Sequence, residues 1–238
     1  MRQSAHNTRP IEEALNALYR QERERILRLE NTGEFDGDFE NPVFGEGPLP
    51  CRVLFIGEAP GREEAASGHP FVGKAGKRLD ELLKTGHIDR SGVYVTNTVK
   101  YRPVVRSVRS VRNRTPSKRE ITAALPSLER EIALLMPEVI VTFGNTPLSA
   151  VLTLAARDGS TVGDLHGSCV PVTVSGREMT LYPMYHPASV IYNRALIDIL
   201  RQDTIRLGEK LVKSRPILFQ DIGDCAIISS TKEGENTL

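Results

Sequence analysis

Residues that could do chemistry follow the short apolar runs of this sequence. His186 comes directly after the run 179–185, and its imidazole can donate a hydrogen bond to an oxygen that gains negative charge. Asn97 follows the run 93–96, and its amide offers a donor and an acceptor to the edge of a pyrimidine. Phe71 could stack on such a ring. Together these residue types suit recognition of a base that has been turned out of a nucleic-acid stack.

Each of these residues also has a plainer interpretation. Phe71 is by default a core aromatic, Asn97 at a strand end is most often a turn or cap residue, and His186 with its following proline could open a helix. The turn 57–61 holds two glycines and a proline, which suit a tight loop as well as a backbone that a planar ligand approaches closely. The order of these residues along the chain, each after an apolar run or a turn, favours the functional interpretation.

The elements that must position these residues are predicted by the apolar patterns. Four runs are continuous rather than alternating, which is typical of parallel strands covered on both faces: 52–56, 93–96, 139–143 and 179–185. Helical spacing lies between and before them, at 10–30, 76–85, 117–136 and 147–156. Ser117 with Glu120 three residues later predicts a capped helix start. We expect one α/β/α domain whose strand ends bring the following loops to one edge.

Length and composition describe an ordinary globular chain. Its 238 residues are 39% hydrophobic and 26% charged, and the net charge of +1 indicates no particular partner. No apolar stretch approaches the roughly 20 residues that span a bilayer, and the polar N-terminus is unlike a secretory signal. The three cysteines, Cys51, Cys169 and Cys225, are too few and too widely spaced for a disulfide scaffold or a four-cysteine site. We expect a cytoplasmic monomer.

The distribution of charge is more informative than its sum. A cationic run without any acidic residue precedes Glu120. It comprises Lys100, Arg102, Arg106, Arg109, Arg112, Arg114, Lys118 and Arg119. A solvated, flexible loop is the alternative, but the run adjoins Asn97, and nucleic-acid binding uses such clusters. The pattern therefore favours a loop that contacts phosphates.

The sequence resembles the uracil-DNA glycosylase superfamily and is family 4-like over about residues 50–200. The resemblance rests on segments in a fixed order: 57–61 (Gly-Glu-Ala-Pro-Gly), 68–76 (Gly-x-Pro-Phe-Val-Gly-Lys-Ala-Gly), 95–103 (Val-Thr-Asn-x-Val-Lys-x-Arg-Pro), 115–121, 137–144 and 186–189 (His-Pro-Ala-Ser). It implies a three-layer α/β/α sandwich with a central four-stranded parallel sheet. That domain would span 46–213, after an N-terminal helix and connection (1–45) and before a C-terminal tail (214–238).

The resemblance implies hydrolysis of the N-glycosidic bond of deoxyuridine in DNA. Phe71 would stack on the flipped uracil, and Asn97 would read its Watson–Crick edge. The backbone of Gly57, Glu58 and Ala59 would hold the ring. His186 would stabilise negative charge on the uracil O2.

Two further roles stay open within the resemblance. The loop after His186 would wedge into the duplex gap, with Ser189 and Val190 as candidates. Classical members place an Asp in their first motif to activate water, where this chain has Ala59. Glu58 and Glu64 are then candidates for positioning water or stabilising the sugar cation, and the sequence does not choose between them.

Two departures from related families concern cofactor and mechanism. Family 4 enzymes hold a 4Fe–4S cluster on four cysteines, but Tyr101 and Ala124 stand at two of those positions, and no cysteine precedes Cys51. Since clusters need thiolate ligands, we expect neither a cluster nor another metal. A covalent branch of the superfamily carries a His in the basic loop, where this chain has Asn113 and no His, so we expect no crosslink to DNA.

Three alternatives to a uracil-specific enzyme are open. The chain could be a DNA-binding relative that has lost catalysis, or a glycosylase for another deaminated base. A P-loop nucleotide-binding protein is the third alternative, because 68–75 nearly matches that motif. Ala75 cannot ligate Mg²⁺, however, and Pro70 removes an amide donor, so this reading is disfavoured.

Overall fold

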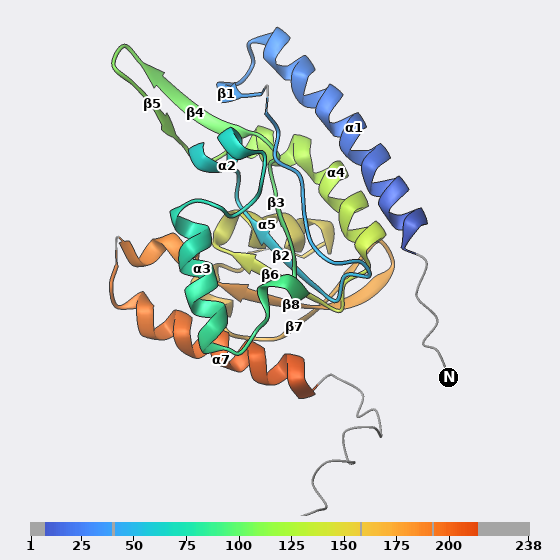
Figure 1. Ribbon diagram of the computed structural model, residues 1–238, viewed down its shortest axis with the longest axis vertical. Coiled ribbons are helices and arrows are strands. Elements are labelled where there is room, and N and C mark those ends of the chain that lie inside the picture. The colour runs from blue at the N-terminus through green and yellow to red at the C-terminus, as the bar shows by residue number, and fades with distance from the viewer. Residues whose placement is uncertain (1–7, 40, 158, 192, 214–238) are drawn as a thin grey trace, which may run out of the picture.

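A five-stranded sheet forms the centre of the molecule, which a computed structural model describes for residues 8–39, 41–157, 159–191 and 193–213 (Figure 1). Its strands are β2 (Val53–Gly57), β3 (Tyr94–Asn97), β6 (Val139–Phe143), β7 (Val170–Val174) and β8 (Arg177–Met184), in the order β3-β2-β6-β8-β7. The strands β3, β2, β6 and β8 are parallel to one another, and β7 pairs with β8 antiparallel. The four predicted parallel strands are confirmed, and the structure adds an antiparallel edge strand.

Buried and exposed residues alternate in the added strand β7, whereas the predicted strands are continuous apolar runs. Val172 and Val174 are buried, while their neighbours in β7 are not, as expected for an edge strand with one face on the core. The turn to β8 has positive φ angles at Ser175 (49°) and Gly176 (76°), the geometry that joins antiparallel strands through two residues.

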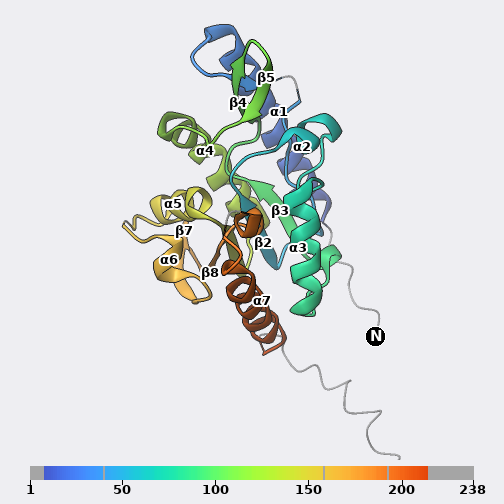
Figure 2. The same ribbon diagram turned by 90° about the vertical axis from the view of Figure 1, so that its left-hand side faces the viewer.

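Helices cover both faces of the sheet and complete the three layers (Figure 2). One face packs against α1 (Arg9–Thr32), α4 (Lys118–Leu135), α5 (Asn145–Leu154) and α6 (Val162–Leu165). The other face packs against α3 (Lys74–Thr85) and α7 (Leu196–Lys213), while the short helix α2 (Arg62–Ser67) precedes α3. Successive residues of β2 point to opposite faces of the sheet. Leu54 and Phe55 are both fully buried, and they belong to the clusters on the two different faces.

The capped helix start predicted at Ser117 is present. The Ser117 hydroxyl accepts from the Glu120 N–H, and the Glu120 carboxylate accepts from the Ser117 N–H. Two 3₁₀ turns, η1 (Arg90–Gly92) and η2 (Pro187–Ile191), complete the described helical structure of the chain.

A separate small sheet rises beside the main one. The strand β1 (Gly37–Asp38) pairs with β4 (Arg102–Ser107), which forms a hairpin with β5 (Ser110–Asn113). Figure 1 shows this hairpin projecting from the body of the molecule. The predicted basic loop is therefore an ordered β-ribbon.

The N-terminal helix packs against the domain that follows it. Helix α1 is not isolated, because Leu15, Leu18 and Ile26 are buried, and Leu15 belongs to the cluster that covers the sheet. The predicted C-terminal tail, 214–238, lies outside the described residues. Among the helices that the structure describes, none has the length and apolar character to cross a membrane.

Candidate active site

A cavity of about 750 Å³ opens at the carboxyl ends of the parallel strands. This is where open α/β sheets bind ligands. It is lined by residues from every loop that the sequence singled out: Glu58, Ala59, Pro60, Gly61, Glu63, Glu64, Phe71, Lys74, Ala75, Asn97, Asn113, Arg114, Thr115, Phe143, Gly144, Asn145, Thr146, His186 and Ala188. The predicted convergence of Phe71, Asn97 and His186 is thus observed.

Phe71 and Asn97 meet over a glycine. A Cβ built on Gly57 would lie 2.7 Å from Cζ of Phe71 and would also collide with Oδ1 of Asn97. Any side chain at position 57 would therefore displace both residues. Phe71 has a positive φ of 58°, and its ring packs edge-on against Phe143 at 5.9 Å between centroids. This non-glycine residue in the left-handed region marks a strained position within a candidate site.

His186 is held as a neutral hydrogen-bond donor. Its Nδ1 accepts from the backbone N–H of Ala188 at 3.1 Å, so the ring proton belongs on Nε2. Burial lowers the pKa of His186 below its ordinary value, which favours the uncharged ring. An Nε2–H donor at the rim of the cavity matches the predicted role toward a developing oxyanion.

The two candidate carboxylates do different things. Glu64 is buried, and its oxygens accept from the backbone N–H groups of Gly61 (3.1 Å) and Gly73 (2.8 Å). It therefore ties the turn after β2 to the loop that carries Phe71. Glu58 is half-buried, and its Oε2 accepts from the Thr146 hydroxyl at 2.7 Å. Among the described residues, Oε1 of Glu58 forms no hydrogen bond or ion pair, which leaves that oxygen to a ligand or water in the cavity.

The cationic run does not act as one surface. Lys100 and Arg102 are buried and pair with Glu131 and Asp38. Arg114 binds Glu120 through two hydrogen bonds, of 2.6 and 2.9 Å. Interpreting the whole run as a phosphate-contacting loop is therefore wrong for Lys100 and Arg102, whose charges are paired inside the protein. Arg114 stays partly exposed (27%), so its predicted contact with DNA remains a prediction.

Three arginines of the run remain on the exposed hairpin. Arg109 lies near its tip, Arg112 lies on β5, and Arg106 contacts Asp38 at 3.0 Å while half of its side chain stays exposed (52%). Asn113 and Arg114 at the base of the hairpin line the cavity. The hairpin therefore begins at the rim of the site and carries its charge outward.

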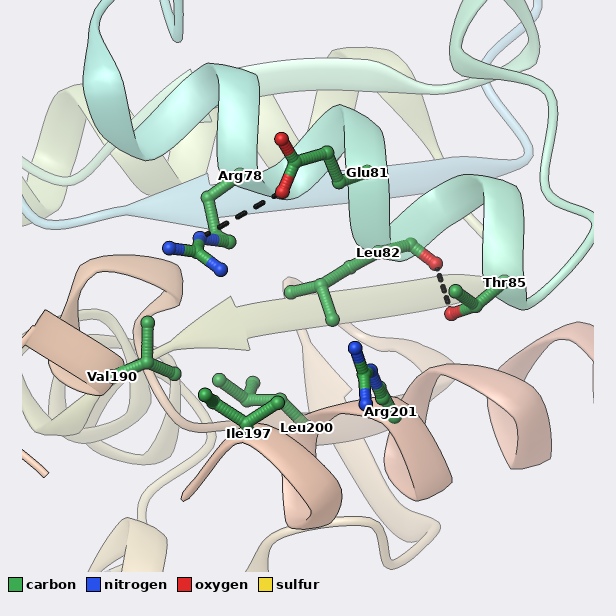
Figure 3. Close-up of a pocket in the computed structure, with 8 residues that line it drawn as sticks. All are labelled: Arg78, Glu81, Leu82, Thr85, Val190, Ile197, Leu200 and Arg201. Carbon is green, nitrogen blue, oxygen red and sulfur yellow. Dashed lines mark hydrogen bonds and ion pairs between the residues drawn. The ribbon is translucent and has the colours of Figure 1, made fainter. Parts of the chain in front are cut away.

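The loop after His186 presents a residue that the sequence analysis did not name. The Ser189 hydroxyl donates to the His186 carbonyl at 2.6 Å. Val190 is buried and lines a smaller pocket of about 90 Å³ between α3 and α7, where it faces Ile197 and Leu200 (Figure 3). Ile191, by contrast, is 63% exposed. Because Val190 and Ile191 are adjacent and both β-branched, the sequence does not show which of them is exposed.

The two residues that the resemblance aligns with cluster ligands are packed inside the protein. Tyr101 and Ala124 are buried in one cluster with Ile26 of α1 and Phe39. The Tyr101 hydroxyl donates to Glu120 at 2.6 Å. Among the described residues, no group of three or more His, Cys, Asp or Glu is placed to hold a metal ion.

Comparison with known proteins identifies the family of this chain. The family model of the uracil DNA glycosylase superfamily matches residues 44–206. A Type-4 uracil-DNA glycosylase of Sulfurisphaera tokodaii is 36% identical over 170 residues, which are 71% of this chain and 74% of that protein. One from Pyrobaculum aerophilum is 37% identical over 164 residues (69% and 80%), and one from Thermotoga maritima 39% over 155 residues (65% and 74%). The chain belongs to the uracil DNA glycosylase superfamily.

Proposed function

We propose that this protein hydrolyses the N-glycosidic bond between uracil and deoxyribose in DNA. The observation that carries the proposal is the meeting of Phe71, Asn97 and His186 in one cavity at the strand ends. The relatives named Type-4 uracil-DNA glycosylase support it, since they match most of the chain. A protein that only bound phosphates would need none of these three side chains.

The geometry suggests how the residues divide the work. A uracil turned out of the duplex stacks on Phe71, and the Asn97 amide pairs with its edge. As the glycosidic bond breaks, electrons move to the uracil ring, and Nε2–H of His186 donates to the oxygen that gains the charge. Glu58 positions water or stabilises the sugar cation through its open oxygen. Glu64, whose oxygens hold two backbone N–H groups, maintains the shape of the cavity.

The direct test is incubation with an oligonucleotide that contains one uracil, followed by alkaline cleavage at the abasic site. Strand cleavage at the uracil position is the expected result. Intact strands despite DNA binding would indicate the inactive relative. Cleavage of substrates with hypoxanthine or xanthine but not uracil would indicate a glycosylase for another deaminated base.

We further propose that the exposed arginines of the hairpin bind DNA phosphates. Replacing Arg106, Arg109 and Arg112 with Ala should weaken binding equally for uracil-containing and normal duplexes. Each lost phosphate contact should reduce the slope of log affinity against log salt by about 0.9. Lys118→Ala shows the effect of losing one exposed cation of the same run outside the hairpin, because Lys118 lies on α4 and does not line the cavity. Its effect on the slope should be smaller than that of the triple variant. An unchanged slope in the triple variant would show that the hairpin is only solvated.

Ile191 is a better candidate than Val190 or Ser189 for the residue that fills the gap left by the flipped base. Its exposed apolar side chain lies at the end of η2, five residues after His186. Ile191→Ala should slow excision from duplex DNA, where the gap must be filled, and leave excision from single strands nearly unchanged. Equal effects on both substrates would exclude this role. Ile205 is also exposed but lies on α7, so Ile205→Ala controls for a general loss of apolar surface.

We infer that the protein works without an iron–sulfur cluster. The packing of Tyr101 and Ala124 against Ile26 supports this inference, since none of the three can supply a thiolate. Protein purified without oxygen should lack broad visible absorption and stoichiometric iron and sulfide. Stoichiometric iron and sulfide in such a preparation would overturn the inference.

A further inference from the structure

A buried ion pair lies directly behind the residue proposed to read uracil. The side chains of Lys100 and Glu131 are 1% and 0% exposed, and Nζ lies 2.6 Å from Oε2. The sequence placed Lys100 in the cationic run, but its side chain turns into the protein. Removing two charges from water costs more free energy than forming an ion pair on the surface. A buried pair at this position therefore indicates a role beyond stability.

The three ammonium protons of Lys100 each have an acceptor. Besides Glu131, Nζ donates to Oγ1 of Thr96 at 2.5 Å and to the main-chain oxygen of Asn97 at 2.7 Å. Thr96 and Asn97 are the last two residues of β3. Lys100 therefore holds the end of the strand from which the Asn97 side chain reaches the cavity.

Glu131 is itself fixed by a second helix. Its Oε1 accepts from the hydroxyl of Tyr19 on α1 at 2.5 Å and from Thr96 at 3.0 Å. The Tyr19 hydroxyl also lies 2.8 Å from that of Tyr94. Burial and the Glu131 carboxylate raise the pKa of Tyr19, so its hydroxyl stays protonated and donates. The network runs from α1 and α4 to the backbone of Asn97.

The opposite side of Asn97 is equally constrained. Its side-chain oxygen packs where Gly57 has no Cβ. The backbone N–H of Thr98 donates to the Gly57 carbonyl at 2.9 Å, so the residue after Asn97 is also fixed. Three contacts therefore fix Asn97: its side chain packs against Gly57, its carbonyl accepts from Lys100, and the residue that follows it is bonded to Gly57.

We propose that Lys100 is a positioning residue that aligns Asn97 for reading the base, and that Glu131 and Tyr19 hold Lys100 in place. This inference rests on the proposed uracil excision. A displacement of about 1 Å at a substrate-contacting group can cost about 10² in rate, which is the effect that the network would prevent.

The test separates positioning from folding. Lys100→Met paired with Glu131→Leu replaces the ion pair by apolar side chains, an exchange that often keeps or raises stability. Rates are compared at equal folded fraction, because the exchange removes the Glu131 acceptor of the buried Tyr19 and Thr96 hydroxyls. We expect the affinity for undamaged duplex DNA to be unchanged and the single-turnover rate on uracil to fall about 10²-fold. Glu131→Gln keeps an oxygen acceptor for Lys100 but leaves its buried charge without a counter-charge, so this variant should lose stability. At equal folded fraction its rate should fall less than that of the double variant, because the contact from Lys100 to the Asn97 carbonyl is kept.

Asp203→Asn serves as the matched control. Asp203 is a fully buried carboxylate that pairs with His166 and Arg206, and it is absent from the lining of the active-site cavity. This variant should lose stability without the rate loss. If Lys100→Met alone, compared at equal folded fraction, loses no more rate than Asp203→Asn, the proposal is wrong. That comparison holds even where the double variant does not fold.

A double-mutant cycle tests whether Lys100 acts through Asn97. In an Asn97→Ala background, Lys100→Met should have little further effect on the single-turnover rate, because the group that it positions is gone. Fully additive losses would overturn the proposal. Wild-type protein that fails to excise uracil would instead contradict the proposed function, so the two failures are distinguishable.

Discussion

His186→Ala should lower the single-turnover rate of uracil excision by roughly 10²–10³, the cost of removing one oxyanion-hole donor. DNA affinity should stay near the wild-type value, because the donor acts on charge that develops only as the bond breaks. The structure supports this division, since Nδ1 of His186 is occupied by the Ala188 N–H and only Nε2–H remains to donate. Rapid-quench measurement with enzyme in excess gives the rate, and duplex binding gives the affinity.

The pH dependence of the wild-type protein provides an independent check on His186. Burial lowers the pKa of His186, so the ring stays neutral through the pH at which an exposed histidine becomes charged. Protonation would place a hydrogen on Nδ1 and break its contact with Ala188. The single-turnover rate should therefore begin to fall with acidification only below a pH of about 6.5, the ordinary pKa of histidine. This fall should be absent in His186→Ala. If His186→Ala cleaves uracil-DNA at the wild-type rate, the site is misassigned.

The fold was largely predictable because its central strands are buried on both faces. A strand covered on both sides favours apolar residues at nearly every position. Every residue of β2 and β6 is buried, and Thr142 is the one polar side chain in these two strands. Strand β7 was missed because its exposed face carries Pro171 and Thr173, which break a continuous run. The hairpin of β4 and β5 was also missed, since its arginines and serines read as a solvated loop.

The sequence predicted which residues of the candidate site come together, because the topology of the sheet determines this. It did not predict the roles that depend on the direction of a side chain. Parallel strand ends must meet, so Asn97 and His186 converge whatever their rotamers. Sequence could not show that Glu64 holds backbone N–H groups while Glu58 keeps an open oxygen. Nor could it show that Lys100 turns inward, because a cation beside arginines carries no sign of a buried partner 31 positions away.

Asn97→Asp should abolish most uracil excision while leaving the fold intact. The uracil edge presents the O4 acceptor beside the N3–H donor, and the Asn97 amide can answer both. An ionised carboxylate offers two acceptors, so one oxygen would face O4 without a hydrogen. Sites built to hydrogen-bond a substrate reject a mismatched one by about 10⁴-fold, and we expect a loss of that order.

The shape of the substitution makes the test specific for base reading. Asp has nearly the volume of Asn, so Gly57 and Phe71 keep their contacts and the unfolding midpoint should change little. Cytosine carries an amino group at the position of O4, which a carboxylate can accept from, so any residual activity should shift toward cytosine. The ratio of single-turnover rates on uracil and cytosine oligonucleotides measures the shift. An Asn97→Asp protein that excises uracil as fast as the wild type would show that another group reads the base, because no arrangement of two acceptors satisfies both atoms of the uracil edge.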